Sequence, residues 1–178
     1  MILVIYAHPY PARSRACAAL LAGIKDRKDL EVRSLYNLYP DFDIDGDAER
    51  AAVDRAQLVV FLHPLYWYSV PALLKHWFDH VLIKGWSHGS EGKALVGKDC
   101  LWVTTTGGGE SAFTPEGRHG HSFEAFEPPV KQTARYCGMN WLAPFTVNGA
   151  HDVSSDGLRE NGSKLRARLD EWAAAKAG

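Results

Sequence analysis

The sequence contains little cysteine and has almost no net charge. Three cysteines, Cys17, Cys100 and Cys137, are scattered over 178 residues, which is too few and too dispersed for a disulfide framework or a zinc knuckle. Lysine and arginine number 20 and aspartate and glutamate 21, so the formal net charge is −1. A charge this close to zero provides no general attraction to nucleic acid or acidic lipid. We therefore expect no nucleic-acid partner, and a local site must select the ligand.

A long hydrophobic run is also lacking. The apolar start, residues 1–6, runs into His8-Pro9 without a basic leader, so it fits neither a signal peptide nor a membrane span. We expect a cytoplasmic protein. Residues 1–178 contain no repeat, linker or low-complexity tract, and this length fits one domain with a substantial core.

Apolar runs alternate with segments of helical periodicity. The predicted strands cover residues 2–7, 30–35, 58–62, 99–104 and 140–146. Helices are predicted after Ser14, over 47–56, 71–81 and 123–136, and near the C-terminus, where the last helix carries Leu158, Leu165, Leu169 and Trp172. Residues 36–45 and 84–97 are predicted loops. This alternation predicts an α/β domain of the flavodoxin-like class, with a five-stranded parallel sheet of order 2-1-3-4-5 and helices on both faces. The Rossmann order is the main alternative. However, the first turn lacks glycine, and both a dinucleotide fingerprint and a Walker A loop are absent.

Three loops of unusual composition follow the first, third and fourth predicted strands. Ligands of an open parallel sheet bind beyond the carboxyl ends of the strands, where the strand order reverses, so these loops should converge. In the first loop, Ser14 can cap a helix whose free N–H groups suit a phosphate. His8, Arg13 and Arg15 can add charge-assisted bonds. An ordinary capped helix with solvated arginines is the alternative.

The loop after the third strand has three consecutive aromatic residues, Tyr66, Trp67 and Tyr68. A loop is too shallow to bury all three, so we expect their faces to bind a planar ring system. Alternatively, Trp67 packs beneath the loop and the tyrosines cover a subunit interface. After the fourth strand, the glycines of segment 107–109 let the backbone approach a flat ligand, or they simply form a flexible turn.

Two histidines, His119 and His121, lie beyond the glycine loop. A histidine at this place can stabilise negative charge that develops on a reduced ring. No carboxylate or thiol at ligand spacing accompanies the pair, so we predict no metal site.

Together these segments resemble the NAD(P)H:quinone oxidoreductases of flavodoxin-like fold, and among them the ancillary oxidoreductases of bacterial glutathione-gated potassium-efflux systems. The resemblance covers nearly the whole chain and lies in residues 5–11, 33–42, the Trp67-Tyr68 pair, 105–111 and 136–142. It implies non-covalently bound FMN. The residues implied are His8, Ser14, Arg15, Ala16 and Cys17 for the phosphate, Leu65, Tyr66, Trp67 and Tyr68 for the ring, and Thr105, Thr106, Gly107 and Gly108 for its pyrimidine edge.

In the wider family, a tyrosine and a histidine beyond the glycine loop assist hydride transfer. By position these fall on Phe113 and His119, and because Phe113 has no hydroxyl, only the catalytic role of His119 carries over. Relatives often have Asn at the position of Cys17, so a side-chain contact is lost there while the backbone donor remains.

The resemblance further implies a two-electron ping-pong reaction, in which the co-substrate NAD(P)H reduces a quinone-type acceptor. It also implies a homodimer and, as a further partner, a potassium-efflux transporter at the inner face of the cell membrane. Two alternatives are a regulatory subunit of that transporter and a one-electron carrier like flavodoxin. Flavodoxins are usually strongly acidic, unlike this chain with its net charge of −1.

Overall fold

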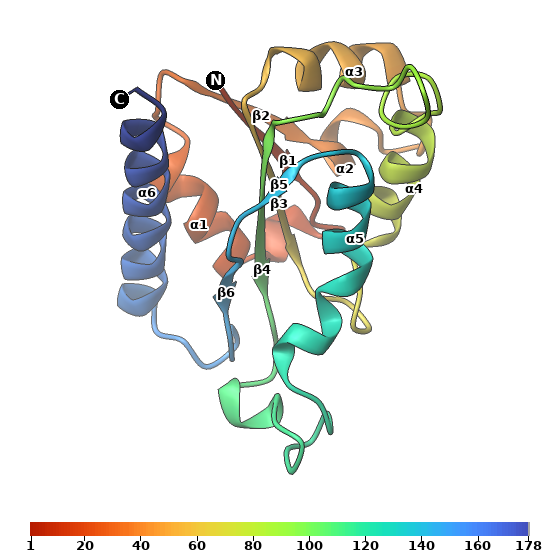
Figure 1. Ribbon diagram of the computed structural model, residues 1–178. Helices are drawn as coiled ribbons and strands as arrows, with labels where there is room; N and C mark the ends of the chain where they lie inside the picture. The colour runs from red at the N-terminus through yellow and green to blue at the C-terminus, as the bar shows by residue number, and fades with distance from the viewer. Residues whose placement is uncertain (178) are drawn as a thin grey trace.

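A parallel sheet with helices on both faces forms the centre of the computed structural model, which describes residues 1–177 (Figure 1). The strands are β1 (Ile2–Tyr6), β2 (Leu30–Ser34), β3 (Leu58–Pro64), β4 (Asp99–Thr105), β5 (Asn140–Trp141) and β6 (Phe145–Val147). The α-helices are α1 (Ala16–Ile24), α2 (Leu35–Leu38), α3 (Gly46–Arg55), α4 (Ala72–Val81), α5 (Pro128–Tyr136) and α6 (Ser155–Ala177). Three short 3-10 turns are η1 (Pro11–Arg13), η2 (Glu110–Ala112) and η3 (Phe123–Phe126).

The strands are hydrogen-bonded in the order β2-β1-β3-β4-β5, and β6 also pairs with β4. Every pairing is parallel; for example, Ile2 lies opposite Leu30 on one side and Leu58 on the other. This order confirms the predicted flavodoxin-like topology. The strand order reverses between β1 and β3, so the carboxyl ends of β1, β3 and β4 are neighbours at one edge of the sheet.

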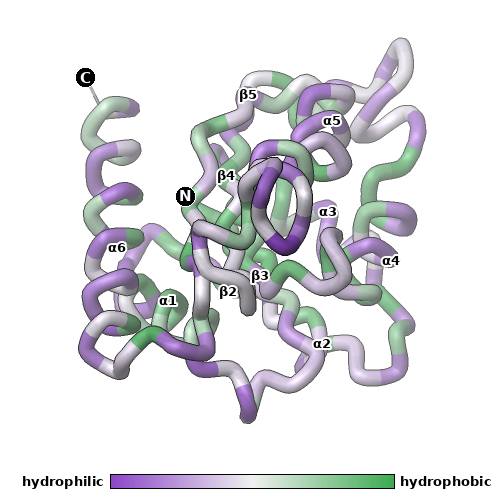
Figure 2. The backbone as a smooth tube through the Cα atoms, turned by 90° about the horizontal axis from the view of Figure 1, so that it is seen from below, coloured by the Kyte–Doolittle hydropathy of each residue, from purple (hydrophilic) through white to green (hydrophobic). Residues whose placement is uncertain are grey.

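Alternate strand residues enter two separate hydrophobic cores. In β1, Leu3 and Ile5 belong to the core beneath α3, α4 and α5, whereas Ile2 and Val4 belong to the core beneath α1 and α6. All five residues of β1 are buried, as expected for a parallel strand covered on both faces. Figure 2 shows the hydrophobic residues concentrated in these central strands.

Helices α1 and α6 cross with their backbones in close approach. A Cβ atom on Gly23 would lie 2.5 Å from the carbonyl oxygen of Gly162, so the crossing requires glycine. The predicted apolar face of α6 is confirmed at Leu165 and Leu169, which are fully buried. Although α6 has 23 residues, none of the helices within residues 1–177 is long and apolar enough to cross a membrane.

One buried carboxylate ties α3 to its surroundings. Glu49 of α3 has no exposed surface. It accepts hydrogen bonds from Arg33 Nη2 at 2.6 Å, Tyr39 Oη at 2.7 Å and Trp77 Nε1 at 2.8 Å. These donors offset the cost of removing the carboxylate from water.

Most boundaries differ from the sequence prediction by one or two residues, and three elements differ by more than that or in kind. The strand predicted over 140–146 is two short strands, because Pro144 has no N–H to donate and interrupts the pairing with β4. The loop predicted over 36–45 contains the last residues of α2. The helix predicted over 123–136 begins as a 3-10 turn, and its α-helical part starts at Pro128, since proline suits a first helical position.

Candidate cofactor site

The loop between β1 and α1 leads to a helix N-terminus with free donors. The N-cap of α1 is Arg15, one residue after the predicted Ser14, but the Ser14 hydroxyl accepts the Ala18 N–H of the first turn at 3.1 Å. The N–H groups of Ala16 and Cys17 belong to the first turn of α1 and have no partner within the helix. Together with the helix dipole they favour an anion.

His8 is a neutral donor rather than a charged one. The Tyr10 N–H donates to His8 Nδ1 at 3.0 Å, so the proton of the neutral ring is on Nε2. Burial lowers the pKa of His8 below its ordinary value of 6.5, and the ring is uncharged at neutral pH. In the ligand-free chain His8 is therefore a neutral donor through Nε2, whereas the sequence suggested a charge-assisted bond.

Arg15 connects the first loop to the loop between β6 and α6. Its Nη1 donates to His151 O and its Nη2 to Val153 O, both at 3.2 Å. The guanidinium thus holds His151 at the edge of the site, beside the start of α1.

Cys17 joins α1 to the end of β4. Its Sγ lies 3.3 Å from Thr105 Oγ1, and burial raises the pKa of the thiol to about 11. Cys17 therefore stays protonated and serves as a small, neutral contact between two of the converging loops.

These groups surround a cavity of about 130 Å³. Ten of the predicted FMN-binding residues line it: His8, Ser14, Arg15, Ala16, Cys17, Leu65, Tyr66, Thr105, Thr106 and Gly107. Four further residues, Arg13, Pro64, Ala150 and His151, complete the lining.

A second cavity of about 220 Å³ adjoins the first. The two share Leu65, Thr106 and Gly107, and the second is also lined by Trp67, Tyr68, Gly108, Phe113 and His119. The structure therefore brings all fourteen predicted site residues to two cavities with a common wall.

The aromatic loop is a tight turn with an unusual backbone. Backbone hydrogen bonds of 3.0 Å join Tyr66 and Ser69 in both directions, and between them Trp67 and Tyr68 have φ angles of 48° and 64°. Non-glycine residues rarely adopt this left-handed region, and such strain is concentrated at functional sites. Trp67 is 92% exposed and Tyr68 46%, so neither is a core residue.

A buried histidine supports this loop from below. His63 Nε2 accepts the Trp102 Nε1–H at 2.7 Å, and its Nδ1 lies 2.9 Å from Pro64 O and donates to it. One neutral tautomer satisfies both contacts. Complete burial lowers the pKa of His63 to about 4, so the ring is a neutral brace where β3 becomes the aromatic loop.

The glycine loop approaches its neighbours closely. A Cβ atom on Gly108 would lie 2.9 Å from His119 Nε2 and 3.2 Å from Ala112 Cβ. The Gly149 N–H donates to Gly108 O and the Ala150 N–H to Thr106 O, each at 2.8 Å. The loop between β6 and α6 is therefore a fourth wall of the site, which the sequence prediction missed.

His119 lies against an apolar ring. The Phe113 ring centroid is 4.5 Å from that of His119, and Phe113 is buried. As expected from the sequence, Phe113 contributes packing and no polar atom. Among residues 1–177, no three His, Cys, Asp or Glu side chains lie together in a way that suits a metal ion.

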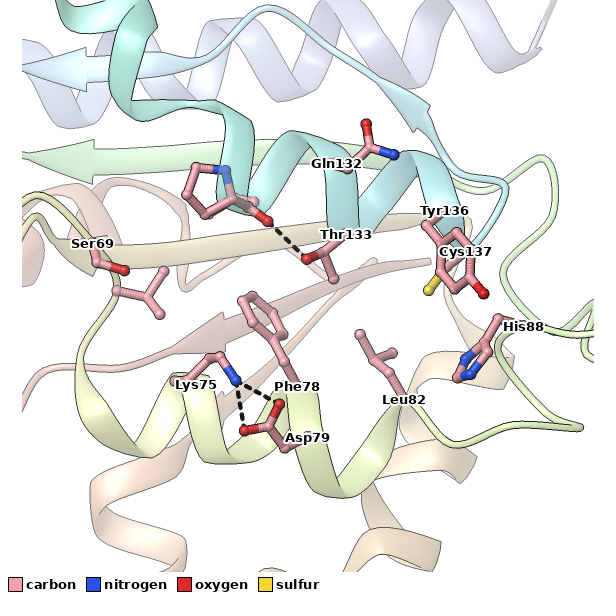
Figure 3. Close-up of a pocket in the computed structure, with 13 residues that line it drawn as sticks. Ser69, Lys75, Phe78, Asp79, Leu82, His88, Gln132, Thr133, Tyr136 and Cys137 are labelled. Carbon is pink, nitrogen blue, oxygen red and sulfur yellow. Dashed lines mark hydrogen bonds and ion pairs between the residues drawn. The ribbon is translucent and has the colours of Figure 1, made fainter.

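A further cavity, of about 670 Å³, lies elsewhere, between α4 and α5. Figure 3 shows Phe78 of α4 and the adjacent Leu82 facing Thr133 and Tyr136 of α5 across it. Ser69 and Val70, directly after the aromatic loop, form one end of this groove.

A family model described as "flavodoxin-like fold" matches residues 1–171. The chain belongs to the flavodoxin-like fold family. Within this family, it is 47% identical over 178 residues to the glutathione-regulated potassium-efflux system ancillary protein KefF of Salmonella arizonae, covering 100% of both chains. The corresponding protein of Salmonella dublin is 47% identical over 172 residues, 97% of each chain. The chain is thus a KefF homologue.

Solved structures with this flavodoxin-like fold agree. The general stress protein 14 of Treponema denticola, in complex with FMN, has a TM-score of 0.91 and 30% identity, covering 96% of this chain and 98% of that one. An NADPH-quinone reductase from P. pentosaceus has a TM-score of 0.84 and 26% identity, covering 93% and 95%. The resemblance to quinone reductases is confirmed at the level of the family.

Proposed function

We propose that this KefF homologue is an FMN-dependent NAD(P)H:quinone oxidoreductase. The observation that carries the proposal is the convergence of four loops on two cavities with a common wall, which together include all fourteen predicted site residues. FMN binding and quinone reduction are properties of proteins with similar folds, and the site of this chain fits both.

The first cavity suits the phosphate end of FMN. The first turn of α1 and the Ser14 hydroxyl offer neutral donors, His8 offers its Nε2–H, and Arg13 and Arg15 supply positive charge nearby. Such a combination of helix N-terminus and charge-assisted donors is typical of phosphate sites.

The second cavity and the shared wall suit a flat ring. Gly107 and Gly108 line this cavity without side chains, and Gly108 is packed so closely on His119 that a Cβ atom there would lie 2.9 Å from its Nε2. Trp67 and Tyr68 add aromatic surface to the lining of the same cavity.

When bound, FMN supplies the hydride chemistry between NAD(P)H and the acceptor. The chain binds and orients the reactants, and the backbone N–H groups of the glycine loop stabilise negative charge near the ring. His119 borders the second cavity and is placed to add a hydrogen-bond donor there. We expect His119→Ala to slow reduction by NAD(P)H while FMN stays bound.

A direct test follows FMN binding and turnover. Purified protein is titrated with FMN by flavin fluorescence, and oxidation of NADH and NADPH is then followed with a panel of quinones. We expect a yellow protein, quinone-dependent oxidation and ping-pong kinetics without a ternary complex. A protein that is colourless and binds no added FMN would refute the proposal.

The phosphate placement has its own test. Ser14→Glu puts a carboxylate at the N-terminus of α1 and should expel FMN by charge repulsion. Ser163→Glu, on the exposed surface of α6, is the matched control and should retain FMN. Full flavin content in the Ser14→Glu variant would show that the phosphate does not bind at the N-terminus of α1.

A second candidate function is regulation of a potassium-efflux transporter. The 47% identity over the full length to KefF, an ancillary protein of such a system, favours it, and it is compatible with the oxidoreductase activity. Potassium efflux is measured in cells that carry the transporter with wild-type protein or His119→Ala. Efflux that stays at the wild-type level with the slowed variant favours the regulatory role, whereas efflux that falls in proportion to turnover makes the enzyme activity primary.

We further propose a homodimer formed through the groove between α4 and α5. The groove is apolar at its base, and its rim carries Lys75 and Asp79, paired at 2.6 Å. A rim of both signs suits the same face of a second copy turned by a two-fold axis. By analytical ultracentrifugation, Tyr136→Glu should give monomers, and Ser163→Glu, on the other side of the sheet, should remain dimeric. A Tyr136→Glu dimer would exclude this interface.

A further inference from the structure

A hydroxyl of the aromatic loop lies within hydrogen-bond distance of the His119 ring. Tyr68 Oη lies 3.4 Å from His119 Nδ1, and the two rings meet edge to face at 79° with centroids 5.5 Å apart. Phe113, which also packs on the imidazole, has no polar atom to offer. Within residues 1–177, Tyr68 is therefore the side chain that can form a hydrogen bond with His119 Nδ1.

Several contacts hold the Tyr68 ring in this position. Its backbone is fixed in the left-handed region, with φ 64°, by the turn between Tyr66 and Ser69. Its ring stacks on Phe126 at a centroid distance of 5.2 Å. Because these contacts involve the backbone and the ring alone, the hydroxyl is not needed to keep the side chain in place.

The other side of the imidazole faces the glycine loop. His119 Nε2 is close enough to Gly108 that a Cβ atom there would lie 2.9 Å away. The backbone of His119 is anchored separately, by its N–H donating to Ala112 O at 3.0 Å. The two ring nitrogens thus have different surroundings, Nδ1 toward Tyr68 and Nε2 toward Gly108 in the wall of the second cavity.

We infer that Tyr68 is the positioning residue of His119, and that its hydroxyl donates to Nδ1 and keeps the proton of the neutral imidazole on Nε2. A neutral imidazole has one donor and one acceptor nitrogen, so a hydroxyl donor at Nδ1 selects the Nε2–H tautomer. His119 then presents a hydrogen-bond donor to the second cavity. This inference rests on the proposed function only for its effect on turnover; the hydrogen bond itself is a property of the ligand-free chain.

The first test needs neither FMN nor substrate. The imidazole nitrogens of ¹⁵N-histidine-labelled, ligand-free protein are observed by NMR, with His119 assigned from His119→Gln. Tyr68→Phe should move the His119 Nδ1 resonance toward that of a nitrogen without a hydrogen bond. Tyr10→Phe, an exposed tyrosine on the first loop that lines neither cavity, should leave it unchanged. An identical His119 spectrum in wild type and Tyr68→Phe would overturn the inference.

The second test is a double-mutant cycle on FMN-loaded protein. Loss of one hydrogen bond predicts about a fivefold fall in kcat/KM for NAD(P)H in Tyr68→Phe. In the His119→Gln background the same change should have almost no effect, because the nitrogen that it serves is gone. Equal losses in both backgrounds would overturn the role of Tyr68. A protein that binds no FMN would refute the proposed function, and the NMR result would still decide the hydrogen bond.

Discussion

The shifted pKa of His63 predicts how the free energy of unfolding changes with pH. In the folded protein this imidazole is completely buried, with one donor contact and one acceptor contact, and its pKa is lowered from 6.5 to about 4. The unfolded chain exposes the ring, which then binds a proton near its ordinary pKa of about 6.5. Between these two values the unfolded state binds more protons than the folded state, so stability falls as the pH falls.

The magnitude follows from the difference between the two pKa values. It corresponds to about 3 kcal/mol, fully available above about pH 6.5 and lost progressively as the pH falls to about 4. This is a large part of the roughly 5–15 kcal/mol by which proteins are stable. Acidification should therefore release the brace under the aromatic loop early in acid unfolding.

The assay compares wild type with His63→Gln, since glutamine keeps a donor and an acceptor but does not titrate. The free energy of unfolding is measured with urea at several pH values from about 7.5 to 4. The advantage of wild type over the variant should shrink by about 3 kcal/mol across this range. His121→Gln, an exposed histidine, is the control and should follow wild type. A wild-type advantage that is independent of pH would refute the reasoning.

Three further changes test the packing around the site and the core. Gly108→Ala should weaken FMN binding about tenfold in a fluorescence titration, because its Cβ would lie 2.9 Å from His119 Nε2. Gly109→Ala, whose Cβ would have nothing within 4 Å, should bind FMN like wild type. Equal affinities of the two variants would contradict the close approach of Gly108 to His119. Glu49→Gln should lower the free energy of unfolding in guanidinium by about 3 kcal/mol, because it leaves a partly buried arginine without its counter-ion; an unchanged midpoint would argue against that network. Gly23→Ala should cost about 2 kcal/mol by separating α1 from α6, and a calorimetric Tm equal to that of wild type would show that the crossing tolerates a side chain.

The sequence predicted the sheet because its strands are read from local features. Buried parallel strands are short apolar runs, and right-handed crossovers restrict how five of them can be ordered. The last strand was harder, since 140–146 looks like one apolar run. The run pairs with β4 only where its residues align with free backbone groups of β4, and Pro144 divides the pairing into the two parts β5 and β6. The extent of α2 likewise depends on tertiary packing, because four residues are too few for a helix to be stable alone.

The candidate site was predictable to the extent that it follows strand ends. Loops after β1, β3 and β4 converge by topology, and their residues do line adjoining cavities. His151 was missed because its loop follows β6, whose end was hidden in the split strand, although the Gly149-Ala150-His151 segment was a usable signal. The neutrality of His8 depends on burial and on one backbone N–H. The contact of Tyr68 with His119 joins positions 51 apart in sequence, and no local pattern encodes it.

The divided last strand also affects how the protein behaves at high concentration. β4 is covered by two short pieces separated by a proline, and the opposite edge strand, β2, carries Glu31 and Arg33. Interrupted pairing, proline and charge are features that prevent an open strand from recruiting another chain. Neither border of the sheet is therefore a template for the cross-chain strand pairing that leads to aggregation. The homodimer proposed above accordingly uses helix surfaces, those of α4 and α5, and leaves both edges of the sheet unpaired.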